Sequence, residues 1–87
     1  MNNLDKLIAL QEKYHLSNIY VAFMIAAFPD CVAHGDEEYM ETWAQRFQNG
    51  RPEMWMDEIR GRKYCQVLYK DHIRQIRHIR YTIPESI

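Results

Sequence analysis

The sequence predicts an all-α fold, a compact bundle of four to five helices in which residues 1–87 form a single helical domain. Three observations favour this class. The chain holds only three glycines and three prolines, whereas an all-β chain needs turn residues about every eight to twelve positions. Residues 40–47 repeat apolar side chains at helical spacing, and residues 19–28 form a long apolar run that Pro29 ends.

The first helix is expected over residues 4–14. Asn3 is a suitable N-cap, and Asp5 in the first turn complements the positive end of the helix dipole. The apolar side chains fall mainly on one helical stripe, formed by Leu4, Leu7, Ile8 and Tyr14. This stripe is the face that we expect to pack.

The second helix is expected over residues 17–28, with Ser17 as its cap, and its apolar run predicts a buried central helix. Residues 19–25 begin with β-branched side chains and can also form a buried strand. Periodicity does not decide between the two, but the alanines and methionine of the run favour the helix. Residues 29–35 are expected to connect this helix to the next one.

The third helix has the clearest amphipathic pattern in the chain. Asp36 is its expected N-cap, and Asn49-Gly50 supplies the C-cap. The apolar residues recur at the spacing i, i+3, i+4 and i+7, as Met40, Trp43, Ala44 and Phe47. This spacing predicts that Trp43 faces the core.

The last helix is expected from Pro52 to about Arg80, stepped at Asp57 and weakened at Gly61. On a helical wheel its apolar face is formed by Cys65, Leu68, His72, Ile76 and Ile79. The opposite face is basic, with Arg60, Lys63, Lys70, Arg74 and Arg77. Together with residues 17–28, the apolar face is expected at the centre of the bundle.

The alternative fold class is α+β with a short strand pair, residues 19–25 and 79–83. Residues 79–83 alternate apolar and polar side chains, a pattern typical of an edge strand. Pro84 is expected to end regular structure in either fold.

Composition places the chain among cytoplasmic proteins. The N-terminus lacks the pattern of a signal peptide, and the apolar run over residues 19–28 is about half of what spans a bilayer, so no membrane is expected. Cys31 and Cys65 are then expected to be reduced thiols. The net charge of −1 hides a division, because residues 1–50 carry three cations and seven anions, and residues 51–87 carry eight cations and five anions.

The sequence predicts neither an enzyme nor a metal or cofactor site. A Cys-Cys-His-His zinc site is conceivable, but Cys65 and His72 on one helix would lie about 10.5 Å apart along the axis. The carboxylates around Glu38 are better explained as complements of a helix dipole than as an acid–base pair. The three isolated glycines exclude a phosphate-binding loop, and no catalytic residue is predicted.

Two features indicate a binding role. Met54, Trp55 and Met56 are consecutive and cannot all face inward on a helix, so we expect Met54 and Trp55 in a partner-binding surface. The second feature is a basic stripe with an aromatic end, formed by Lys63, Lys70, Arg74, Arg77 and Tyr81.

The function expected from these features is that of a non-enzymatic interaction protein, a small regulator, adaptor or inhibitor that binds a protein partner. Chains of this size include regulators encoded by phages and mobile elements. A regulator that binds nucleic acid through the basic stripe is the alternative, and a homodimer is compatible with both.

Overall fold

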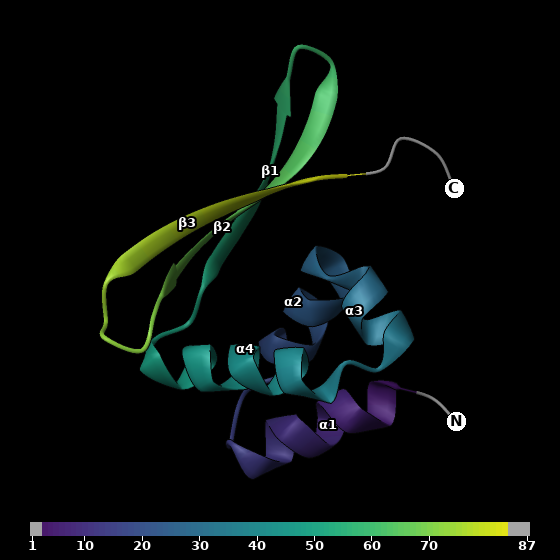
Figure 1. Cartoon of the computed structure of the whole chain (residues 1–87), viewed down its shortest axis with the longest axis vertical. Helices are drawn as coiled ribbons and strands as arrows, with labels where there is room; N and C mark the ends of the chain where they lie inside the picture. Colours follow the sequence, from purple (N-terminus) through teal and green to yellow (C-terminus); the bar gives the residue numbers. More distant parts are fainter. Residues whose placement is uncertain (1–2, 84–87) are drawn as a thin grey trace.

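A computed structural model describes residues 3–83 and shows an α+β fold rather than the predicted all-α bundle. Four helices come first and a three-stranded antiparallel sheet follows (Figure 1). The elements are α1 (Leu4–Lys13), α2 (Ile19–Ala27), α3 (Pro29–His34), α4 (Glu37–Asn49), β1 (Glu53–Ile59), β2 (Arg62–Lys70) and β3 (Ile76–Thr82). The helices gather on one side of the sheet, and the end of the β1–β2 hairpin projects beyond them (Figure 1).

The helices expected in the first half of the chain are present. α1, α2 and α4 match the predicted segments within a few residues, so a strand over residues 19–25 is wrong. The expected connection over residues 29–35 instead contains α3, which starts at Pro29 and ends at Gly35 in a left-handed conformation. The Asp36 side chain caps α4 by accepting a hydrogen bond from the Tyr39 backbone N–H at 3.1 Å.

The predicted helix from Pro52 to Arg80 is wrong, because the chain reverses direction twice within it. Arg60 and Gly61 both have positive φ angles, 53° and 78°, which is the geometry of a two-residue hairpin turn. The expected weakening at Gly61 is therefore a complete reversal. On β2, Cys65 and Val67 face the helices, but Tyr64 and Leu68 on the opposite face are also apolar and half-buried, so the two-residue period of the strand is hidden in the sequence.

The second reversal joins β2 to β3 through a turn that Asp71 organises. The Arg74 N–H donates to the Asp71 carbonyl at 3.0 Å, and Arg74 takes a positive φ of 63°. The Asp71 carboxylate accepts from the backbone N–H groups of Ile73 and Gln75, and from Nε of Arg77 at 2.9 Å. The alternative strand prediction for residues 79–83 is confirmed for residues 79–82, which belong to β3. Pro84 lies outside the described residues.

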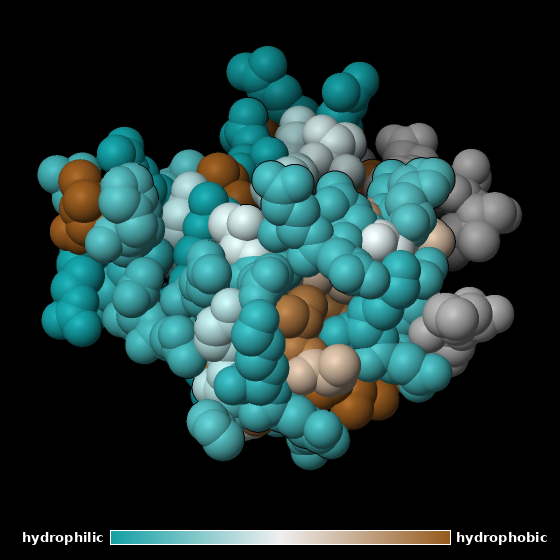
Figure 2. Space-filling model, turned by 60° about the horizontal axis from the view of Figure 1, so that its bottom comes forward, coloured by the Kyte–Doolittle hydropathy of each residue, from teal (hydrophilic) through white to brown (hydrophobic). Residues whose placement is uncertain are grey.

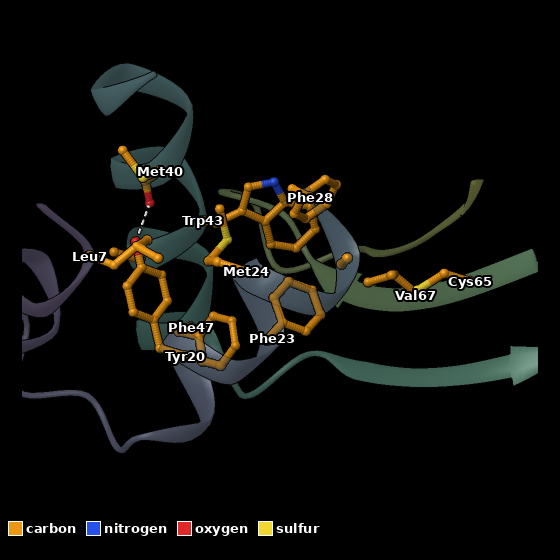
Figure 3. Close-up of a cluster of buried hydrophobic side chains, with 12 residues drawn as sticks. Leu7, Tyr20, Phe23, Met24, Phe28, Met40, Trp43, Phe47, Cys65 and Val67 are labelled. Carbon is orange, nitrogen blue, oxygen red and sulfur yellow. Dashed lines mark hydrogen bonds between the residues drawn. The ribbon is translucent and has the colours of Figure 1, made fainter. Parts of the chain in front are cut away.

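The core is an aromatic cluster between α2, α4 and the inner face of the sheet (Figure 3). Trp43 is fully buried as predicted, with its ring centroid 4.9 Å from that of Phe28 and 5.1 Å from that of Tyr69. The Tyr20 hydroxyl donates to the Met40 carbonyl at 2.7 Å and fastens α2 to α4. The sheet contributes mainly β2 to this core, because the residues of β1 are exposed or half-buried.

Candidate binding surface

The first component of the candidate surface is the outer side of α2. This helix carries no charged or amide side chain over its nine residues. One side, with Tyr20, Phe23 and Met24, packs into the core, but Ile19 and Ile25 on the other side remain 39% and 46% exposed. A helix that is apolar all round is normally buried all round. The exposed side of α2 is therefore apolar surface that the fold itself leaves uncovered.

The second component is β1, which lies at an edge of the sheet because the strand order is β1-β2-β3. Its register places Met54 opposite Val67 and Met56 opposite Cys65, so both methionines point to the helical side of the sheet. Met56 is nevertheless 61% exposed, because the hairpin extends past the helices. Trp55 points to the opposite, outer face and is 41% exposed.

A groove of about 440 Å³ connects these two components. Its walls come from α2, from the segment that leads into β1, and from β1 itself. The lining residues are Ile19, Ala22, Phe23, Arg51, Pro52, Glu53, Met54 and Trp55. We call this groove together with Ile25 and Met56 the α2–β1 surface. Sequence reasoning found Met54 and Trp55 but missed the α2 residues, because an unbroken apolar run gives no sign of which side stays exposed.

The charges along β1 are all negative. Glu53 and Asp57 point to the outer face, where they lie opposite Leu68 and Tyr64, whereas Glu58 lies opposite Lys63. No ion pair among residues 3–83 includes a carboxylate of β1. The edge strand is therefore an acidic rim on an apolar surface.

The outer face of the sheet holds Trp55 in a defined position. Its indole stacks on the His78 imidazole, with centroids 6.0 Å apart and planes 17° apart. His78 Nε2 and the Gln66 side-chain carbonyl oxygen lie 2.6 Å apart, and the Gln66 amide donates to the Asp57 carboxylate at 3.3 Å. Because an amide oxygen only accepts, His78 carries its proton on Nε2. This chain of contacts orients Trp55 while leaving part of its ring free.

The five residues of the predicted basic stripe do not share one line, because the helix that grouped them is absent. Lys63 lies beside the β1–β2 turn, and Lys70 and Arg74 lie at the other end of β2. Arg77 is held by the Asp71 carboxylate. Tyr81 points into the helical side, where its ring meets Phe28 at 4.9 Å.

The hydroxyl of Tyr81 adds a polar contact to this packing. It lies 3.3 Å from the hydroxyl of Tyr39, and burial together with this hydrogen bond raises the pKa of Tyr81. The Tyr81 side chain is thus part of the packing between the sheet and the helices rather than of an exposed basic surface. The basic stripe, as a continuous track for phosphates, has no counterpart in the structure.

The two thiols and the Glu41 carboxylate lie in environments that do not favour catalysis. Burial raises the pKa of the Cys65 thiol, and burial with the Asp36 carboxylate raises that of Cys31, so both free thiols stay protonated at neutral pH. Hydrogen bonds from Lys13 and Tyr14 lower the pKa of Glu41.

Within residues 3–83, no three His, Cys, Asp or Glu side chains converge as metal ligands would. The helical spacing that argued against a shared zinc no longer applies, since Cys65 lies on β2 and His72 in the turn that follows.

The face of the molecule below the helices is mostly hydrophilic (Figure 2). Figure 2 shows the molecule from the side below the helices of Figure 1, where hydrophilic residues cover most of the face and hydrophobic ones emerge in separate places. A groove between α1 and α4 on the helices is lined by both apolar and charged residues, among them Lys6, Lys13 and Glu37. Among residues 3–83, none of the helices has the length and apolar character needed to cross a bilayer.

Comparison of the chain with protein-family models, with curated proteins and with solved structures gives no significant match.

Proposed function

We propose that this chain is a non-enzymatic interaction protein that binds a protein partner through the α2–β1 surface. The observation that carries the proposal is the apolar outer side of α2 next to an edge strand with three consecutive large apolar side chains, all more than one third exposed. Contiguous exposed apolar surface with an acidic rim is typical of protein interfaces. Trp and Met are also enriched in the centres of such interfaces.

A protein partner is favoured over nucleic acid by the charges around this surface. A nucleic-acid site needs a track of cations toward phosphates, and β1 presents carboxylates instead. Arg77, the middle of the expected basic track, is engaged with Asp71. The remaining cations of the predicted basic stripe, Lys63, Lys70 and Arg74, lie at separate ends of the sheet.

The test is affinity capture from native lysate, with and without nuclease, of the chain and two double variants. We expect the double variant Met54→Ser with Met56→Ser to capture less partner than the unaltered chain, by a factor of about ten or more. The reason is that each hot-spot side chain contributes more than about 1 kcal/mol to the binding free energy. The matched control is Ile73→Ser with Ile76→Ser, which removes exposed apolar side chains from the β2–β3 turn and from the start of β3, 57% and 70% exposed. The control is expected to capture the partner like the unaltered chain.

Two outcomes contradict the proposal. Equal retention by both double variants would remove the α2–β1 surface from the function. Loss of all captured material after nuclease treatment would replace the protein partner with a nucleic acid. Thermal melts of each variant confirm that the compared proteins are folded.

A further inference from the structure

We propose that the partner binds as an added strand along β1, through an extended segment that alternates apolar residues with lysine or arginine. The inference rests on the proposed function, since it specifies how the α2–β1 surface recognises its partner. Three properties of β1 carry it: a free backbone edge, an apolar groove on one side, and on the other side carboxylates that form no ion pair among residues 3–83.

The backbone of β1 is available for pairing. A two-residue hairpin turn makes the flanking pair, Ile59 and Arg62, hydrogen-bonded to each other. Alternation along an antiparallel pair then turns the N–H and C=O groups of Met54, Met56 and Glu58 away from β2, toward the free edge. The Glu58 N–H already donates to the Asp57 carboxylate at 2.9 Å, so Met54 and Met56 supply the N–H groups for pairing. The pairing of β2 with β3 supports this assignment. The Lys63 carbonyl accepts from the Ile83 N–H at 2.9 Å, so the backbone groups of odd-numbered β2 residues bond toward β3 and those of even-numbered residues bond toward β1.

β1 has few of the usual protections of an edge strand, and those that it has are its carboxylates. The strand contains no proline, and its pairing with β2 runs without a bulge from Glu53 to Ile59. Natural edge strands are commonly blocked by lysines, prolines, bulges or a covering element. β3, at the opposite edge, carries Arg77 and Arg80, whereas β1 carries no cation.

The side chains of an added strand would alternate between two environments. On the helical side they would lie beside Met54 and Met56 and over the groove toward Ile19, which selects apolar residues. On the outer side they would lie beside Glu53, Trp55 and Asp57. Two carboxylates around an exposed indole select a cation, by charge and by cation–π contact.

A second copy of this chain fits the edge less well. Pairing β1 with β1 of another molecule would put the carboxylates of both strands side by side with no cation between them. Pairing β1 with the basic β3 of another molecule is complementary in charge, but it leaves open edges and so builds unclosed chains of molecules. We therefore assign the edge to a different protein with an apolar and basic extended segment.

The probe is a synthetic heptapeptide in which arginine alternates with isoleucine or valine, added to isotope-labelled protein. At saturating peptide we expect hydrogen exchange at the amides of Met54 and Met56 to slow by about tenfold or more, as they gain partners. The amides of Trp55 and Asp57 already bond to β2 and should change little. Methylating the peptide nitrogens one at a time should abolish binding at alternate positions only.

Two controls isolate the sequence pattern. A peptide of the same composition in scrambled order should bind more weakly. Glu53→Lys in the protein should weaken the alternating peptide about threefold or more, while Glu12→Lys on α1, which makes the same change in net charge, should have a smaller effect.

The outcomes separate this inference from the proposed function. Peptide binding without protection at Met54 and Met56, or without the alternating effect of methylation, would overturn strand addition. Failure of the alternating peptide to bind at millimolar concentration would overturn it too. Both results leave the capture experiment to judge the protein-binding function by itself. Concentration-dependent assembly that β1 variants abolish would instead assign the edge to a second copy.

Discussion

At the scale of single residues, Trp43 is the largest fully buried side chain among residues 3–83. It contacts aromatic rings from α2, α4 and β2, and the Arg46 guanidinium lies 4.5 Å from its ring centroid. Its indole nitrogen has no hydrogen-bond partner among residues 3–83. The stabilising effect of Trp43 therefore comes from packing rather than from a polar contact.

We predict that Trp43→Ala lowers the free energy of unfolding by about 3–5 kcal/mol, the range for deleting a buried large aromatic side chain. Trp43→Phe should cost clearly less, because it keeps a ring in the cluster and loses no hydrogen bond. Urea unfolding of the three proteins measures both differences. An unchanged midpoint for Trp43→Ala would contradict the described core.

Asp71 gives a pH-dependent contribution to stability. Burial acts to raise the pKa of its carboxyl, but hydrogen bonds from Arg77 and from the backbone of Gln75 and Ile73 outweigh it and lower the pKa. A carboxyl with a lowered pKa in the folded state stabilises the fold above its unfolded pKa, about 3.9, and this stabilisation disappears as the pH falls through the folded pKa.

We predict that Asp71→Asn lowers Tm at pH 7, and that the difference from the unaltered protein narrows as the pH falls below about 4. Thermal melts between pH 7 and pH 2 test this. Glu12→Gln, an exposed change on α1, is the control and should leave Tm nearly constant. A difference that stays the same at every pH would show that the Asp71 hydrogen bonds do not depend on its charge.

At the scale of elements, the β1–β2 hairpin is built on an unfavourable turn residue. Arg60 has a φ of 53°, a conformation that asparagine adopts at less cost than arginine. We predict that Arg60→Asn raises the free energy of unfolding by about 0.5–1 kcal/mol. Chemical denaturation measures the gain.

The neighbouring glycine supplies the control for that prediction. A Cβ at Gly61 would meet no atom within 4 Å, so Gly61→Ala tests backbone conformation alone. At a φ of 78° this change should cost about 1 kcal/mol. A gain for both substitutions would contradict the hairpin geometry.

The same turn helps to explain why α1, α2 and α4 were predicted correctly but β1 and β2 were not, while only residues 79–82 of β3 were anticipated, in the alternative fold. α4 is specified locally, by Asp36 at its start, by Trp43 and its neighbours at helical spacing, and by Gly50 at its end. The sheet depends on two reversals whose residues, Arg60-Gly61 and the segment from Asp71, lack the common Asn-Gly pattern. Which side chains of the sheet are buried depends on helices that are distant in the sequence. A helical wheel cannot represent such contacts.

At the scale of the whole molecule, the candidate surface arises from how two layers meet, and this limits what the sequence can predict. Met54 and Trp55 were expected near the surface because three consecutive large apolar residues cannot all face inward on a helix. That helix is absent, but the alternation of a strand likewise turns Trp55 to the face opposite Met54 and Met56. The exposed side of α2 was not, because only the position of the sheet decides which side of that helix is covered. Glu53 and Asp57 join the surface for the same reason, through a register that depends on the turn.

The burial pattern of β1 also bears on how this protein can change over generations. Since β1 contributes no buried side chain, substitutions along it are largely free of the packing constraint that fixes β2 and α4. The strand that we assign to recognition can therefore accumulate changes while the aromatic core persists. A chain organised in this way can keep binding a partner whose sequence changes, or acquire a new partner, at little cost in stability.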